Sequence, residues 1–180
     1  GGGVARSGAV VLPTQALDPG VRTILFTDIV GSTAMTQRLG DRAAMEVLEV
    51  HDHSVRAALA RTGGREVKHT GDGLMAAFAS AQLAVRCTSM IHAELRAAAP
   101  IAGEQVQVRV GASAGEPVER QGDFFGSTVQ LAARLCAHAR PGQTLVSTSV
   151  VELCSGIQFG DVGEVVLKGF PQPMRAHSVE

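Results

Sequence analysis

Residues 26–33 of this chain read Phe-Thr-Asp-Ile-Val-Gly-Ser-Thr, and residues 68–73 read Lys-His-Thr-Gly-Asp-Gly. Each segment places a carboxylate, Asp28 or Asp72, at the end of an apolar, strand-like run and follows it with glycine. Gly31 allows a tight turn and a close approach to an anion, and the helical stretch after it would present free N–H groups that attract phosphate. Two carboxylates beside such a turn suit Mg²⁺ or Mn²⁺, which fill their remaining positions from substrate phosphates. The two segments together predict metal-dependent chemistry on a nucleoside triphosphate.

Each segment alone also has an ordinary structural explanation. An aspartate at a strand end followed by Gly-Ser-Thr is common as a turn that leads into a capped helix. The dipeptide Asp72-Gly73 is a favoured two-residue hairpin turn. The segments occur together, however, and Lys68 stands ahead of the second aspartate in the same motif. This combination favours the functional interpretation.

The composition describes a chain that builds its core from aliphatic side chains and carries almost no net charge. Its 180 residues are enough for one domain with a good core. The 16 basic and 17 acidic residues give a net charge of −1, and neither Trp nor Tyr is present. A protein held to nucleic acid by its overall charge, or by stacked aromatic rings, is therefore not expected.

Three cysteines, Cys87, Cys136 and Cys154, form no Cys-x-x-Cys pair and no Cys/His cluster with zinc spacing. We expect them to be small buried hydrophobes in a reducing compartment. No apolar run approaches the roughly 20 residues of a membrane span. These features predict a cytoplasmic domain, attached to regulatory or membrane segments if a parent protein carries them.

The pattern of apolar and turn-forming residues divides the chain into a lead and one domain. Residues 1–20 are rich in Gly, Pro and small residues and are predicted to form a flexible lead or linker, so the catalytic domain is assigned to residues 21–180. Apolar alternation predicts strands at residues 21–26, 65–69, 74–78, 106–114, 144–147, 157–159 with 163–167, and 174–179. Helical spacing predicts helices at residues 32–61 with a break at Gly40-Asp41, 80–98 and 128–139.

The order of these elements predicts the fold class. The order is β-α-α-β-β-α-β followed by further α and β elements, which indicates an α/β (α+β) fold with a ferredoxin-like core. Helices are expected to pack against a mixed sheet that is extended by the C-terminal strands. The hairpin that turns at residues 70–73 places Asp28 and Asp72 on neighbouring strand ends.

Four motifs, in order along the chain, carry a resemblance to a known family. They are residues 26–33, residues 67–73 (Val-Lys-His-Thr-Gly-Asp-Gly), residues 122–134 (Gly-Asp-Phe-Phe-Gly-Ser-Thr-Val-Gln-Leu-Ala-Ala-Arg) and residues 167–170 (Leu-Lys-Gly-Phe). The chain resembles the class III nucleotidyl cyclase catalytic domain, the adenylate and guanylate cyclases, in its bacterial form. The likeness covers about residues 21–180.

The resemblance implies a metal and phosphate site in the first half of the chain. Asp28 and Asp72 match the aspartates that hold two divalent metal ions, Mg²⁺ or Mn²⁺, and Ile29 would add its backbone carbonyl. A turn whose N–H groups hold the β- and γ-phosphates is matched by Val30, Gly31, Ser32 and Thr33.

The resemblance also implies base-reading and catalytic residues. Lys68 and Asp123 match the pair that reads adenine, Arg134 matches the arginine that stabilises the pentavalent transition state, and Lys168 matches a lysine that binds the terminal phosphates. Gln130 stands where the family usually has an asparagine that positions the ribose. In the family the two groups of residues come from different subunits, which implies a head-to-tail homodimer with composite active sites.

The expected activity is that of an adenylate cyclase, which converts ATP to 3′,5′-cyclic AMP and pyrophosphate by a two-metal mechanism. A lysine donor and an aspartate acceptor complement adenine, whereas guanine reverses that edge. A guanylate cyclase would usually carry Glu and a small or uncharged residue in place of Lys68 and Asp123. Two further alternatives are a degenerate nucleotide-binding regulatory module, favoured only by Gln130, and a polymerase-like palm domain, for which the chain lacks a basic face.

Some residues depart from the family pattern or receive a structural interpretation. Gln130 adds a methylene that can lower the rate, and Ser32 replaces a phenylalanine of many members, which loosens the packing near the phosphate turn. The six histidines are dispersed and are expected to be solvated or to cap helices. His69 is singled out among them because it adjoins Lys68, and Arg65 is expected to face solvent.

Overall fold

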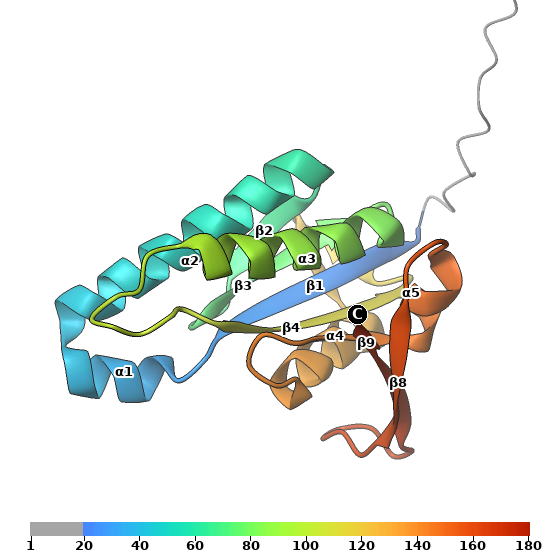
Figure 1. The fold of residues 1–180 in the computed structure, drawn as a ribbon. Helices are drawn as coiled ribbons and strands as arrows, with labels where there is room; N and C mark the ends of the chain where they lie inside the picture. Colours follow the sequence, from blue (N-terminus) through green and yellow to red (C-terminus); the bar gives the residue numbers. More distant parts are fainter. Residues whose placement is uncertain (1–19) are drawn as a thin grey trace, which may run out of the picture.

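The computed structural model describes residues 20–180, and the predicted lead at 1–20 lies, except for Gly20, outside the described residues. Seven strands form one sheet in the order β2-β3-β1-β4-β7-β9-β8. The sheet is mixed because β4 and β7 are parallel, whereas the other neighbours are antiparallel. Helices α2 and α3 cover one face of the sheet, and α4 covers the other (Figure 1).

The N-terminal part of the domain follows the predicted β-α-α-β-β-α-β order. Its elements are β1 (Arg22–Ile29), α1 (Ser32–Leu39), α2 (Asp41–Thr62), β2 (Arg65–His69), β3 (Gly73–Phe78), α3 (Ala81–Ala97) and β4 (Val108–Gly115). The predicted helix break is confirmed at Gly40, whose φ of 86° interrupts the helical path. Two helices therefore replace one long one at this point of the chain.

The C-terminal part contains three elements that the sequence pattern did not predict, the two strands of a hairpin and a short helix. Its elements are β5 (Val118–Arg120), β6 (Asp123–Phe125), α4 (Ser127–His138), β7 (Thr144–Ser147), α5 (Thr148–Leu153), β8 (Phe159–Val165) and β9 (Met174–Val179). The β5–β6 hairpin and α5 were missed because three-residue strands and a six-residue helix are too short to show a period. The two short runs predicted at 157–159 and 163–167 form one strand, β8, with an irregularity between Asp161 and Gly163.

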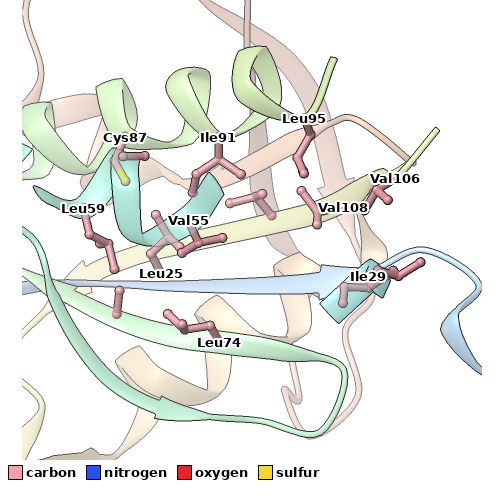
Figure 2. Packing of buried hydrophobic residues seen from close by; sticks show 14 of the residues in the cluster. Leu25, Ile29, Val55, Leu59, Leu74, Cys87, Ile91, Leu95, Val106 and Val108 are labelled. Carbon is pink, nitrogen blue, oxygen red and sulfur yellow. The ribbon is translucent and has the colours of Figure 1, made fainter. Parts of the chain in front are cut away.

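The larger core lies between the sheet and the α2–α3 layer. Figure 2 shows Leu25 and Leu74 of the sheet packed against Val55 and Leu59 of α2 and Ile91 of α3. Burying side chains of this size contributes about 1.5–3 kcal/mol each, so this layer fixes the central strands. A second cluster, which includes Ile24, Met75, Phe124 and Ala132, fills the face that α4 covers.

Alternation along the strands assigns each residue of the site to one face of the sheet. On β1, Leu25 and Ile29 join the α2–α3 core, whereas Ile24 joins the cluster on the α4 face, so Asp28 belongs to the α4 face as well. Lys68 pairs with Met75 and shares that face, while its neighbour His69 pairs with Leu74 and faces α2. Two successive residues of β2 thus serve opposite sides of the sheet.

Within residues 20–180, no helix has both the length and the apolar character needed to cross a lipid bilayer.

Candidate active site

The carboxylates of Asp28 and Asp72 stand at adjoining strand ends, as predicted. Asp28 pairs with Gly73 across β1 and β3, and the Ile29 N–H donates to the Asp72 carbonyl at 2.8 Å. Burial raises the pKa of Asp28, and the nearby Asp72 carboxylate raises it further. Two carboxylates that disfavour each other's charge fit a divalent cation, which would relieve that repulsion.

Glycine at position 73 is required by the close approach of β1 and β3. A Cβ atom there would lie 1.7 Å from the Thr27 carbonyl oxygen. The preceding turn also favours a glycine, because Gly71 has a φ of 67°. Gly73 is therefore the residue that lets the two strands meet closely enough to place Asp72 beside Asp28.

Arg109 lies at the same strand end, although none of the sequence motifs includes it. It pairs with Asp28 across β1 and β4, and its Nη1 is 3.9 Å from the Asp28 Oδ2. Its charge lowers the pKa of Asp28, against the effect of burial. A cation at this position can also face a bound phosphate. The position would be recognised only by knowing the register of β4 on β1.

The described residues contain no group of three or more His, Cys, Asp or Glu side chains arranged to hold a metal ion. The two aspartates are therefore a sparse ligand set. Sparse sets of hard oxygen ligands suit Mg²⁺ or Mn²⁺ that are bound together with a nucleotide.

The predicted phosphate turn begins the helix α1. Gly31 has a φ of 63° and precedes the first helical residue, Ser32. The Val30 N–H donates to the Gln107 carbonyl at 2.9 Å, so the amides that remain for a phosphate are those of Gly31, Ser32 and Thr33.

A cavity of about 170 Å³ lies beside this turn, lined among others by Ser32, Met35 and Asp72. This space is consistent with the looser packing expected where serine replaces phenylalanine.

Lys68 and Asp123 are in direct contact, although 55 residues separate them in the sequence. The Lys68 Nζ donates to the Asp123 Oδ2 at 2.7 Å, and this bond, with a second from the Phe124 N–H, lowers the pKa of Asp123. Both side chains are partly exposed, at 49% and 27%, and a ligand can reach them. The structure thus brings together the two residues that the resemblance assigned to the nucleobase.

Arg65 is exposed, as predicted, and it also holds the β5–β6 hairpin in place. Its Nη1 donates to the Gly122 carbonyl at 3.0 Å, and its guanidinium lies over the Phe124 ring at 5.2 Å from the centroid. These contacts fix the hairpin that carries Asp123.

Gln130, Arg134 and Lys168 are exposed and stand apart from the two pairs described above. Gln130 and Arg134 lie one turn apart on the side of α4 that faces away from its buried residues. Lys168 lies in the connection between β8 and β9, where the Phe170 N–H closes a turn on the Leu167 carbonyl. Within residues 20–180, none of the three forms a hydrogen bond or ion pair with Asp28, Asp72, Lys68 or Asp123.

A polar network that the sequence did not predict lies on the opposite face of the sheet. His51 of α2 is 0% exposed, and its Nε2 is 2.8 Å from the Thr27 Oγ1. His92 is partly buried, and its Nε2 lies 2.9 Å from the Thr144 Oγ1. The expectation that the histidines are solvated or capping is therefore wrong for these two residues. A signal did exist for His51, because it continues the buried stripe of Val47, Val55 and Leu59 along α2.

His69 points to α2, away from Lys68. Its Nε2 is 3.1 Å from the Asp52 Oδ2, and Asp52 in turn contacts His51. The direct partner of Lys68 is Asp123.

Comparison with known proteins agrees with this geometry. A family model described as "Adenylate and Guanylate cyclase catalytic domain" matches residues 18–180. An uncharacterized protein of Mycobacterium tuberculosis is 35% identical over 153 residues, which is 84% of this chain and 39% of that protein. An adenylate cyclase of Streptomyces coelicolor is 34% identical over 132 residues, which is 71% of this chain and 32% of that protein. The chain thus spans well under half the length of these curated relatives.

A solved structure has the same fold. It is that of an adenylate cyclase from Trypanosoma brucei in its monomeric state, which matches with a TM-score of 0.82 and 24% identity over 89% of each chain.

Proposed function

Because this chain belongs to the adenylate and guanylate cyclase catalytic domain family, we propose that it is an adenylate cyclase that converts ATP to 3′,5′-cyclic AMP and pyrophosphate. The choice of ATP over GTP rests on one observation, the 2.7 Å contact between the Lys68 Nζ and the Asp123 Oδ2. A donor and an acceptor held side by side match the edge of adenine, which offers N1 as acceptor and its 6-amino group as donor. Lys68 would donate to N1, and Asp123 would accept from the amino group.

Guanine is disfavoured at the same pair for the reverse reason. It would direct an N–H toward Lys68 and a carbonyl oxygen toward Asp123, which leaves polar groups on both sides without partners. A bound base would shield these groups from water, and each polar group that is left unpaired after burial costs about 1–3 kcal/mol. Discrimination of about 100-fold or more against GTP is therefore expected.

Asp28 and Asp72, with the Ile29 carbonyl, would hold the two divalent cations. Asp28 suits this role because its pKa is raised by burial and by Asp72, so that a bound cation would favour the charged form. When bound, two such cations supply activation of the ribose 3′-oxygen and neutralisation of the charge on the leaving pyrophosphate.

The chain's own amides and cations would orient the triphosphate. The amides of Gly31, Ser32 and Thr33 would bind the β- and γ-phosphates at the start of α1. Arg109, 3.9 Å from Asp28, stands where it can face the same phosphates.

The remaining catalytic groups would come from a second copy of the chain. Gln130 and Arg134 lie on the exposed side of α4, and Lys168 is exposed between β8 and β9. We therefore propose a head-to-tail homodimer in which Asp28 and Asp72 of one subunit face Lys68, Asp123 and Arg134 of the other. Arg134 would stabilise the pentavalent transition state, Gln130 would position the ribose and Lys168 would bind the terminal phosphates.

Mixing two inactive variants tests the composite site. Asp28→Ala and Arg134→Ala are each expected to abolish turnover, and a mixture that exchanges subunits is expected to recover part of the wild-type rate. Asp161→Ala, which removes an exposed aspartate outside the site, is the matched control and should stay active. No recovery despite demonstrated subunit exchange would place the whole site within one chain.

The base assignment is tested by replacing the pair. Lys68→Glu with Asp123→Ser should lower the ratio of ATP to GTP turnover at least about tenfold. Arg175→Glu with Asp161→Ser alters another exposed pair of equal length, 2.7 Å, on β8 and β9 and should leave the ratio unchanged. An unchanged ratio in the Lys68/Asp123 variant would contradict the assignment.

A further inference from the structure

A chain of hydrogen bonds runs behind the proposed active site, on the face of the sheet that α2 covers. The Leu74 N–H donates to the Thr27 Oγ1 at 3.1 Å, and that oxygen is 2.8 Å from the His51 Nε2. The His51 Nδ1 is 2.9 Å from the Asp52 Oδ1, and the Asp52 Oδ2 is 3.1 Å from the His69 Nε2. Among the described residues, no buried side-chain nitrogen or oxygen lacks a partner, so the chain of bonds is complete.

The order of donors and acceptors in this hydrogen-bond network follows from Asp52 and His51. Interactions with both histidines lower the pKa of Asp52, which is therefore an acceptor at each oxygen. The His51 Nδ1 must then carry the proton that it donates to Asp52. Burial lowers the pKa of His51, which favours a neutral ring whose Nε2 accepts from the Thr27 hydroxyl.

The two ends of this network adjoin residues that serve the two different composite sites of the proposed homodimer. Thr27 precedes Asp28, and Leu74 follows the Asp72-Gly73 turn, so one end ties together the strand ends that carry both aspartates. His69 follows Lys68 on β2, the edge strand of the sheet, so the other end ties the base-reading strand to α2. The side chains of the network face α2, while those of Asp28 and Lys68 face α4.

We propose that His51 and Asp52 are positioning residues that hold the metal-binding strand ends and the base-reading strand in one fixed arrangement. The proposal rests on the cyclase function given above. The two residues touch neither nucleotide nor cation, and they act through Thr27 and His69. His51 orients the Thr27 hydroxyl. The oxygen of that hydroxyl accepts a hydrogen bond from the Leu74 N–H at the point where β1 and β3 meet. Asp52 fixes His69 and with it the strand that carries Lys68.

Other links between α2 and β2 are weaker candidates for this role. Arg56 donates to Glu66 at 3.0 Å, but its side chain is half exposed. Exposed ion pairs contribute little to position. Asp52 is only 15% exposed and His51 is fully buried, so the bond between them is shielded from water, whereas the Asp52–His69 bond is open to solvent on the side of His69.

His92 offers a matched control. It is a part-buried histidine whose Nε2 lies 2.9 Å from the Thr144 Oγ1, so it makes the same kind of bond as His51. It joins α3 to β7, away from both aspartates and from Lys68. Phenylalanine at position 92 therefore imposes a similar loss of hydrogen bonding without touching the network.

The experiment compares His51→Phe, Asp52→Ala, Asp52→Asn and His92→Phe in the full chain with Mn²⁺ and ATP. Each is assayed at the same interval below its own melting temperature. His51→Phe and Asp52→Ala are expected to lower kcat about tenfold or more relative to His92→Phe. Asp52→Asn is expected to stay within about threefold of wild type, because its amide oxygen still accepts from His51 and its NH₂ can donate to a neutral His69.

A readout without substrate tests the same arrangement. The ¹⁵N spectrum of labelled His51 is expected to show a neutral ring protonated at Nδ1, and exchange of the Leu74 amide hydrogen should accelerate in His51→Phe but not in His92→Phe. Protonation at Nε2, or equal kcat in His51→Phe and His92→Phe, would overturn the proposal. If His51→Phe does not fold, the Asp52 pair decides, since equal losses in Asp52→Ala and Asp52→Asn would also overturn it. A wild-type chain that forms no cyclic nucleotide would instead refute the proposed function and leave the spectroscopic result interpretable.

Discussion

Gly73→Ala is expected to disable the site with the addition of a single methyl group. The new Cβ would lie 1.7 Å from the Thr27 carbonyl oxygen and 2.6 Å from the carbonyl carbon, whereas real Cβ atoms essentially never come within 3.0 Å of such neighbours. Both obstructing atoms belong to the backbone, so β1 and β3 must separate by roughly 1 Å or more at the end that carries Asp28 and Asp72. Misplacement of about 1 Å costs on the order of 100-fold in rate, which corresponds to about 2.7 kcal/mol.

The assay measures cyclic AMP formed from ATP with Mn²⁺, at a temperature where far-ultraviolet circular dichroism shows the variant to be folded. Gly71→Ala is the matched control, because Gly71 lies two residues away with a φ of 67° and a Cβ added there would meet no atom within 4 Å. It should lose about 1–2 kcal/mol of stability from left-handed strain and keep its activity within a few-fold. Equal activity in the two variants would refute the reasoning, since the close contact of the strands would then be irrelevant to the metal site.

Three further predictions concern single side chains. Arg109→Met should raise the pKa of Asp28, because the charge of the arginine lowers it. The acidic limb of the pH–rate profile should therefore move to higher pH. An unmoved limb would exclude an electrostatic effect of Arg109 on Asp28. Burial lowers the pKa of His92 from 6.5 to about 4. The free energy of unfolding should therefore fall by up to about 3 kcal/mol as pH drops from 6.5 toward 4. Urea titrations of His92→Gln should show a smaller change of this free energy over the same pH range. Burial raises the pKa of Cys87 to about 11 and that of Cys136 to about 12. A thiol reagent at neutral pH should therefore label the partly exposed Cys154 first in the folded chain. Earlier labelling of Cys87 would contradict the packing.

The sequence predicted the helices and strands whose apolar residues recur at a regular spacing. Alternation and helical spacing placed β1, the β2–β3 hairpin, α2 and α3, and Gly40 marked the break between α1 and α2. The β5–β6 hairpin escaped because its strands have three residues each, and it is held by the long-range contacts of Arg65. Such contacts depend on the path of the chain, which a local pattern does not contain.

The candidate site was predicted unevenly for the same reason. Asp28 and Asp72 could be placed together because the β2–β3 hairpin turns at Asp72 and was expected beside the first strand, which ends at Asp28. Lys68 and Asp123 were paired through the family resemblance. Residues whose importance comes from the register of distant strands were missed, as Arg109 shows. His51 was misjudged because its residue type suggested a solvated side chain, although its position in the buried stripe of α2 indicated the core.

The most direct test of the central claim is the product formed by the purified wild-type chain with Mn²⁺ and either ATP or GTP, separated by chromatography. We predict 3′,5′-cyclic AMP and pyrophosphate from ATP, with kcat/KM at least about 100-fold lower for GTP. Equal use of the two nucleotides would contradict the roles of Lys68 and Asp123. The absence of any cyclic nucleotide from a folded, dimeric chain would contradict the assignment of cyclase activity.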